Sequence, residues 1–157
     1  ACLTRFKDRE NVSVYQKAVS ADGRDIRMQI DRLRSRQELN TNDGVLKFAS
    51  INIQEIFDSV NEIELLKMNI EGMEYECLSQ LIRSNTLIKA NHLLIQFHNF
   101  ESEADKKRNE IIEVIEDDFT NVFNKTRNSE KEGGNKRLRF FGNVALKKTD
   151  GGGEEGE

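Results

Sequence analysis

Residues 63–83, IELLKMNIEGMEYECLSQLIR, decide the fold class of this chain. The run begins with a mostly apolar stretch, 63–70, which predicts a strand covered on both faces. Glu71-Gly72 interrupts it, and from Met73 onward apolar residues recur at helical spacing. A second apolar run, 92–98, follows a short polar break. Strand, helix and strand with short connections indicate a βαβ unit with a right-handed crossover and parallel strands.

The N-terminal third predicts further strands. Apolar and polar residues alternate over 11–20 and again over 25–30, the pattern of strands with one solvated face. Residues 31–44, rich in Arg, Asn and Asp, are expected to form a loop. Residues 45–53 predict a short strand, and 54–60 make about two helical turns. With the βαβ unit, this alternation of strands and helices indicates an α/β fold.

The C-terminal third predicts a helix and a hairpin. Residues 103–124 carry an apolar stripe typical of one long amphipathic helix. Residues 137–141 and 144–148 are expected to pair as an antiparallel hairpin around a Gly142-Asn143 turn. The Gly- and Glu-rich residues 149–157 predict a disordered tail. The stripe of the expected helix consists of Ile111, Ile112, Ile115, Phe119, Val122 and Phe123.

Composition excludes several classes of protein. The chain has 157 residues, 36% hydrophobic and 33% charged, with a formal net charge of −4. An acidic balance argues against a general nucleic-acid or anionic-membrane binder, because phosphate neutralisation needs a surplus of Lys and Arg. No apolar run approaches the roughly 20 residues of a membrane span. Two cysteines, Cys2 and Cys77, are too few for a disulfide framework, and the compartment stays open with the cytoplasm slightly favoured.

Polar side chains gather where the two expected parallel strands end. Asn69, Glu71 and Glu74 follow the first strand, and His98 ends the second. Ligands of open α/β sheets bind at the carboxyl ends of strands, which lie ~5 Å apart. The two glutamates are read either as caps of the helix N-terminus or as ligand-binding groups. His98 is read either as a structural histidine or as a proton acceptor, and no metal site is predicted.

These residues also carry a family resemblance. Residues 65–78 resemble the signature of the FkbM-type methyltransferases, an apolar strand, then Lys-Ile-Asp-(Ile/Val)-Glu-Gly-x-Glu and a helix. Supporting segments lie in the same order at 11–20, 51–53 and 95–98. The resemblance covers about residues 11–100 and implies a Rossmann-like methyltransferase sheet that uses S-adenosylmethionine.

The resemblance implies a reaction and roles for single residues. The reaction would be methyl transfer to a hydroxyl of a sugar or small metabolite. Asn69 and Glu71 would orient the substrate hydroxyl beside the methyl group. Glu74 would be a second hydrogen-bond acceptor, and His98 would be the base. Ala18-Val19 would line the adenine side of the cofactor.

Departures from the family pattern open an alternative. Asn69 replaces the usual Asp and Gln96 the usual Glu, which removes basicity but keeps hydrogen-bonding capacity. No Gly-rich turn between a strand and a helix precedes residue 11. Residues 1–148 therefore resemble the second half of the methyltransferase domain, and we expect this chain to be a piece of something longer. The alternative to a methyltransferase is a non-catalytic remnant or interaction module. Loss of neighbouring strands would leave an open sheet edge, which predicts self-association or an improvised partner.

Overall fold

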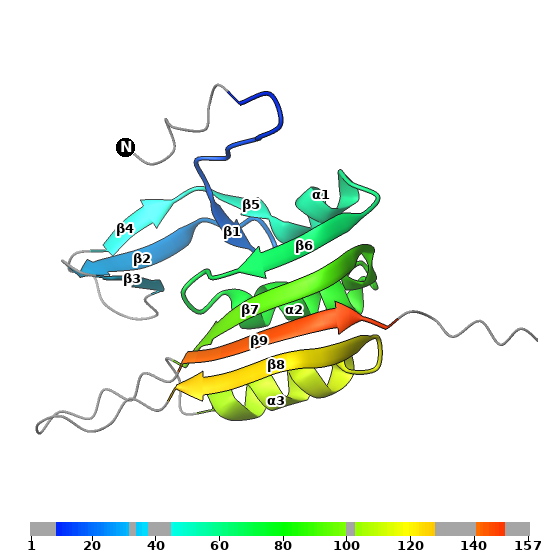
Figure 1. Ribbon diagram of the computed structural model, residues 1–157. Coiled ribbons are helices and arrows are strands. Elements are labelled where there is room, and N and C mark those ends of the chain that lie inside the picture. The colour runs from blue at the N-terminus through cyan, green and yellow to red at the C-terminus, as the bar shows by residue number, and fades with distance from the viewer. Residues whose placement is uncertain (1–8, 32–33, 38–44, 100–102, 128–140, 150–157) are drawn as a thin grey trace, which may run out of the picture.

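The computed structural model describes residues 9–31, 34–37, 45–99, 103–127 and 141–149. Its main sheet has four strands in the order β6-β7-β9-β8 (Figure 1). β6 and β7 are parallel, whereas β9 is antiparallel to both of its neighbours. These strands span Ile63–Met68 (β6), Ala90–His98 (β7), Phe119–Arg127 (β8) and Phe141–Lys148 (β9).

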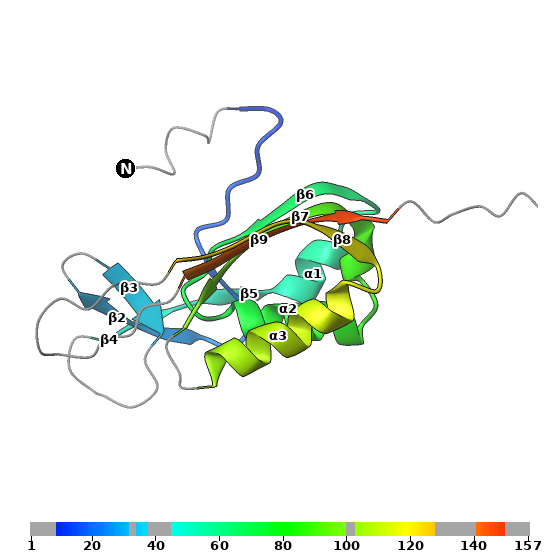
Figure 2. The same ribbon diagram turned by 60° about the horizontal axis from the view of Figure 1, so that its bottom comes forward.

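The helices cover one face of this sheet. Figure 2 shows α1 (Ile53–Asp58), α2 (Glu74–Arg83) and α3 (Ala104–Ile115) on the same side of the four strands. A short 3-10 helix, η2 (Leu87–Lys89), precedes β7. The core forms between the helices and the sheet because alternate strand residues and one stripe of each helix are apolar. Its largest fully buried apolar side chains are Phe57, Cys77, Leu78, Leu81, Leu93, Ile95, Phe97, Phe119 and Val144.

The N-terminal strands form two smaller sheets. β1 (Ala18–Ser20) pairs in parallel with β5 (Ser50–Asn52). β2 (Ile26–Asp31) lies between β3 (Arg34–Gln37) and β4 (Val45–Phe48), antiparallel to both. The chain therefore has a mixed α/β fold, as expected, and an additional antiparallel sheet formed by β2, β3 and β4.

The central βαβ prediction is confirmed in its elements and strand direction. β6, α2 and β7 follow one another, and the register Leu66↔Leu93 and Met68↔Ile95 is parallel. The expectation that β6 is buried on both faces is wrong. Leu65 is 54% exposed and Lys67 is exposed, because helices pack against only one side of the strand.

Two C-terminal predictions are wrong. The helix expected over 103–124 ends at Ile115, and Phe119–Arg127 is strand β8. Three acidic residues, 116–118, interrupt the helix, and the β-branched and aromatic residues that follow fit a strand better. The hairpin turn at Gly142-Asn143 does not exist, since both residues lie inside β9 and pair with β7 and β8. Residues 137–140 and all of the expected tail 149–157 except Thr149 lie outside the described residues.

Smaller differences concern the N-terminal third. The strand expected over 11–20 is limited to Ala18–Ser20, and the expected loop contains β3. The strand expected over 45–53 divides into β4 and β5, and Ile53 already begins α1. Within the described ranges β6 pairs with one strand only, β7. None of the helices described is long and apolar enough to span a bilayer.

Candidate functional site

The turn from β6 into α2 has an unusual backbone. Glu71 has a φ of 53° and Gly72 a φ of 106°, so two successive residues lie in the left-handed region. Glycine adopts this conformation freely, but a residue with a Cβ does so at a cost. Strained non-glycine residues of this kind concentrate at functional sites. The sharp reversal places Glu71 at the carboxyl end of β6, where the sequence predicted it.

Glu74 closes this turn from the inside. Its side chain is fully buried, and its two carboxylate oxygens accept hydrogen bonds from the backbone N–H groups of Ile70, at 2.9 Å, and Gly72, at 2.8 Å. A carboxylate in the first turn of a helix also interacts favourably with the helix dipole. Both N–H groups belong to the turn before α2, so Glu74 stabilises this turn and does not cap the helix by a hydrogen bond.

The same carboxylate binds His98. Nδ1 of His98 lies 2.7 Å from Oε1 of Glu74, and both side chains are at most 1% exposed. Nε2 of His98 lies 3.7 Å from Oε1 of Glu71 and 3.4 Å from Nε2 of Gln96. When the proton of the neutral imidazole is on Nδ1, Nδ1 donates a hydrogen bond to Glu74 and Nε2 carries the free lone pair of the ring. The pair thus fixes the orientation of the imidazole and directs its second nitrogen towards the half-buried Glu71.

A second group of residues, which sequence reasoning missed, supports the end of β7. Asn99 is 7% exposed; its Oδ1 accepts a hydrogen bond from the Tyr75 hydroxyl at 3.0 Å and its amide donates to Asp105 at 2.8 Å. The ring of Tyr75 packs against Phe97 with centroids 5.5 Å apart. These contacts tie β7 to α2 and α3. The signal was an Asn directly after His98 at a strand end.

The remaining candidates lie in different surroundings. Asn69 is exposed at the residue after β6, on the strand end that also leads to Glu71. Ala18 and Val19 belong to β1, in a separate two-stranded sheet, where they are half-buried and pack against the core. The structure therefore brings Glu71, Glu74 and His98 together.

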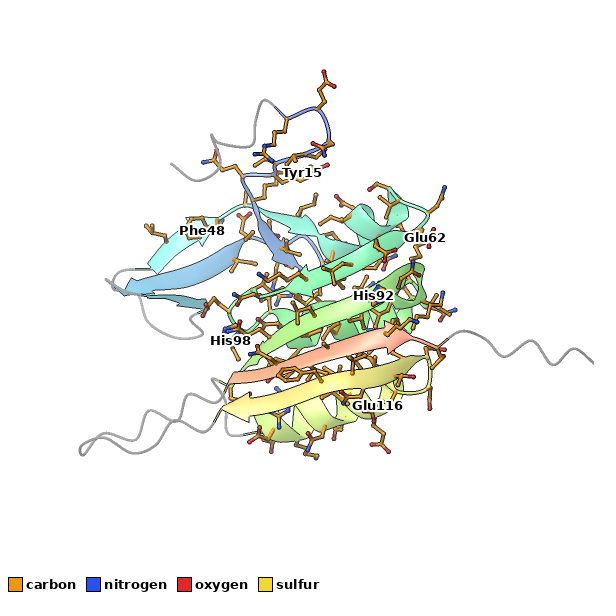
Figure 3. The ribbon with its side chains drawn as sticks, viewed as in Figure 1. Tyr15, Phe48, Glu62, His92, His98 and Glu116 are labelled. Carbon is orange, nitrogen blue, oxygen red and sulfur yellow. The ribbon has the colours of Figure 1, made fainter. Side chains whose placement is uncertain are left out.

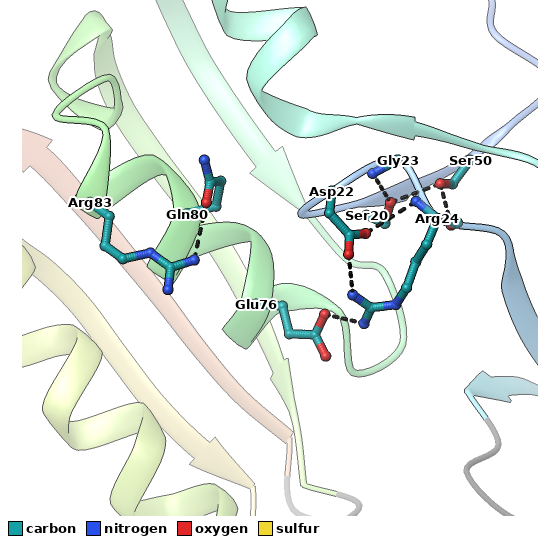
Figure 4. Close-up of polar contacts among 8 residues, drawn as sticks. All are labelled: Ser20, Asp22, Gly23, Arg24, Ser50, Glu76, Gln80 and Arg83. Carbon is teal, nitrogen blue, oxygen red and sulfur yellow. Dashed lines mark hydrogen bonds and ion pairs between the residues drawn. The ribbon is translucent and has the colours of Figure 1, made fainter.

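The turn after β1 is fastened to α2 by charged groups (Figure 4). The Arg24 guanidinium bonds Asp22 at 2.9 Å and also contacts the Glu76 carboxylate on α2. The backbone N–H and guanidinium of Arg24 hold the pKa of Asp22 below its ordinary value. Ser20, fully buried, accepts a hydrogen bond from the Gly23 N–H at 2.9 Å.

A surface cavity of about 480 Å³ lies beside this turn, between α2 and α3. Its lining includes Asp22, Arg24, Glu76 and Arg83, but not Glu71, Glu74 or His98. Arg83 already bonds the Gln80 side chain at 3.0 Å (Figure 4). The cavity is therefore separate from the histidine, and its charges already pair with one another or with neighbouring side chains.

Thiol chemistry is excluded at α2. Cys77 is fully buried, and burial, reinforced by Glu76 and Glu74, raises the pKa of its thiol to about 12. A thiol with such a pKa holds almost no thiolate near neutral pH and is a poor nucleophile. Within the described ranges, no group of three His, Cys, Asp or Glu side chains could hold a metal ion.

Fold and site together define an α/β protein with a buried Glu–His pair at the carboxyl ends of two parallel strands. Comparison with known proteins gives the family. The methyltransferase FkbM domain model matches residues 7–131, most of the chain, so this chain belongs to that family. The match confirms the resemblance carried by residues 65–78. No curated protein and no solved structure matches the chain.

Proposed function

We propose that this domain belongs to an S-adenosylmethionine-dependent O-methyltransferase and that its described part forms the side of the site that binds the methyl acceptor. The family is one of methyltransferases, which supports methyl transfer in general. The observation that carries the proposal is the buried contact of 2.7 Å between Glu74 and His98 Nδ1, which leaves Nε2 as the basic nitrogen. The acceptor is a hydroxyl of a sugar or small metabolite.

The residues divide the work of binding and proton transfer. When bound, S-adenosylmethionine supplies an electrophilic methyl group. His98 Nε2 takes the proton that the acceptor hydroxyl loses, a role that requires a base within hydrogen-bond reach. Glu71 and the amide of Asn69 hold the hydroxyl in line, because correct alignment supplies much of the rate of such a transfer. Glu74 acts as a positioning residue, since both of its oxygens are already bonded.

The cofactor contacts are only partly present. Ala18 and Val19 offer half-buried apolar side chains, which suit one side of an adenine ring. The Glu74 carboxylate bonds the N–H groups of Ile70 and Gly72 in the turn before α2. In the part of the chain that the structure describes, no Gly-rich turn joins a strand to a helix. These residues therefore fit the acceptor side and one apolar wall, and we assign the other cofactor contacts to residues outside those described.

Two measurements test the proposal. Titration calorimetry with S-adenosylmethionine should give binding tighter than about millimolar, and transfer of a labelled methyl group to a panel of sugars should identify an acceptor. His98→Gln should lower the transfer rate about 100-fold or more, the usual contribution of a general base. His92→Gln changes the other histidine of the chain, at the opposite end of β7, and should leave the rate within about twofold.

Two outcomes would contradict the proposal. Equal losses in both histidine variants would show that His98 has no special role. No heat and no transfer at millimolar cofactor would favour the alternative, a non-catalytic interaction module. One observation favours this alternative: within the described residues, no Gly-rich turn joins a strand to a helix.

A further inference from the structure

The last turns of α2 and α3 enclose a smaller cavity, of about 190 Å³. α2 ends at Arg83, and the chain then reverses at Asn85, which has a φ of 54°. α3 ends at Ile115, shortly before β8 begins. The cavity lies between these two helix ends and is lined by residues from 81–88 and 114–119. We call it the helix-end pocket.

The helix-end pocket lies at the end of the sheet opposite to the candidate site. In the register of β7, β9 and β8, His98 pairs with Phe141, whereas Phe119 pairs with Lys148 at the other end of β9. Figure 3 labels His98 and Glu116, the residue directly after α3, at opposite ends of the sheet. The pocket is therefore separate from the residues of the proposed methyl transfer.

The inner wall of the pocket is apolar. Leu81, Ile115 and Phe119 are at most 2% exposed, whereas Val114, at the mouth, is 49% exposed. An apolar cavity of about 150 Å³ holds a benzene molecule, so a cavity of about 190 Å³ accommodates one leucine or phenylalanine side chain. Sites that bind whole small molecules usually measure about 300–1,000 Å³. The size of the pocket therefore fits a single anchoring side chain of a protein better than a metabolite.

The mouth of the pocket is acidic. Asp117 and Asp118 belong to its lining, which contains no Lys or Arg among the described residues. Both are exposed, and no described side chain forms an ion pair with either of them. The ammonium of Lys148 donates a hydrogen bond to the backbone carbonyl of Ile88, a pocket residue, at 2.9 Å, and it balances at most one of the two carboxylates. The mouth therefore keeps a net negative charge.

We propose that the helix-end pocket binds a segment of another protein in which a leucine or phenylalanine stands next to lysine or arginine residues. The apolar side chain fills the pocket and leaves water, as the anchor residues that carry most of the binding energy of an interface do. The cations beside it complement Asp117 and Asp118, and the same carboxylates repel acidic partners.

Charge argues against several other occupants. Two copies of this mouth that face each other across a twofold axis would bring their carboxylates together, which disfavours a symmetric dimer. Nucleic acids and anionic membranes present negatively charged phosphates, which Asp117 and Asp118 repel. An apolar pocket with an acidic mouth therefore selects a basic protein segment with one apolar anchor.

Three short labelled peptides of equal length test the proposal on the full chain. The first carries one phenylalanine between two lysines in a Gly-Ser background. The second has serine in place of the phenylalanine, and the third has glutamate in place of both lysines. Fluorescence anisotropy should show binding of the first peptide and binding of the other two weaker by about tenfold or more. In an NMR titration, the first peptide should shift mainly the amides of residues 81–88 and 114–119.

Two pairs of variants locate the binding. Val114→Arg puts a cation at the mouth, which repels the lysines, and should weaken the first peptide about tenfold or more. Leu46→Arg makes the same kind of change at a side chain that is 51% exposed on β4, outside the pocket, and should keep the affinity within about twofold. Asp117→Asn should weaken the first peptide about threefold, whereas Glu55→Gln, at an exposed residue of α1, should not. Circular dichroism checks that each variant folds.

Several results would overturn the proposal. Equal affinity for the first and second peptides removes the apolar anchor, and equal affinity for the first and third removes the charge preference. An unchanged affinity in Val114→Arg places the binding elsewhere. If no peptide binds and benzylammonium shifts the amides of the pocket, the ligand is a small cation. A dimer seen by light scattering and abolished by Val114→Arg makes the occupant a second copy. None of these measurements depends on methyl transfer.

Discussion

Two His–Glu pairs stand at opposite ends of β7, and Figure 3 labels both histidines. At the carboxyl end, His98 Nδ1 lies 2.7 Å from Glu74, and the side chains are 1% and 0% exposed. At the amino end, His92 Nδ1 lies 3.3 Å from Glu64, and the side chains are 43% and 79% exposed. The residue types are the same, but the surroundings differ.

The difference shows what burial adds to such a pair. Water competes with the contact at the surface, so an exposed ion pair contributes little to stability. A buried carboxylate must satisfy its oxygens within the protein, and Glu74 does so with two backbone N–H groups besides the histidine. The pair at the carboxyl end is consequently fixed in one geometry, as a proton-accepting histidine requires.

Neutralising Glu74 and Glu64 in turn should show the largest difference between the two pairs, measured as a loss in the free energy of unfolding. Glu74→Gln replaces an acceptor oxygen by a donor inside a site that offers three donors, and should lower the free energy of unfolding by about 3–5 kcal/mol. Glu64→Gln changes an exposed group and should stay within about 0.5 kcal/mol. Urea denaturation followed by circular dichroism measures both. Similar small losses in the two variants would show that the buried pair is no more stabilising than the exposed one.

Relieving the backbone strain at Glu71 should change stability and activity in opposite directions. Glu71 has a φ of 53°, and Glu71→Gly should raise the free energy of unfolding by about 0.5–1 kcal/mol while it lowers methyl transfer. Asn85 has a φ of 54° just after α2, where Asn tolerates this conformation, so Asn85→Gly should gain only a few tenths of a kcal/mol and keep activity. Thermal unfolding and the transfer assay provide the two readouts. A stability loss in Glu71→Gly would refute strain at this residue.

The exposed network of Arg24 should give the smallest effect. Its partners Asp22 and Glu76 are about half exposed, so Arg24→Gln should shift Tm by less than about 3 °C. Because Arg24 lowers the pKa of Asp22, that contribution is present at neutral pH and disappears as the pH falls through the lowered value. In Arg24→Gln an NMR titration should find the pKa of Asp22 closer to its ordinary value. An unchanged pKa would contradict the role of Arg24.

The spacing of apolar residues predicted helices and strands well where it fitted only one kind of element, and poorly where it fitted both a helix and a strand. Residues 63–83 combine a short apolar run, Glu71-Gly72 and a helical stripe, which only a strand, turn and helix satisfy. Over 103–124, Phe119 fits a helical stripe as well as it fits β8, so local spacing could not find the end of α3 at Ile115. Pairing with β9, a segment further along the chain, decides that the second part is a strand.

The candidate site divides in the same way. Glu71, Glu74 and His98 were identified from their positions at the ends of expected strands, because parallel strands bring their carboxyl ends together. Local sequence also determined the turn, since a Gly follows Glu71 where the chain reverses. The tertiary structure alone decided that Glu74 is fully buried and bonds a histidine 24 positions away. Burial and long-range pairing depend on how helices and strands pack, and no local pattern of residues contains that information.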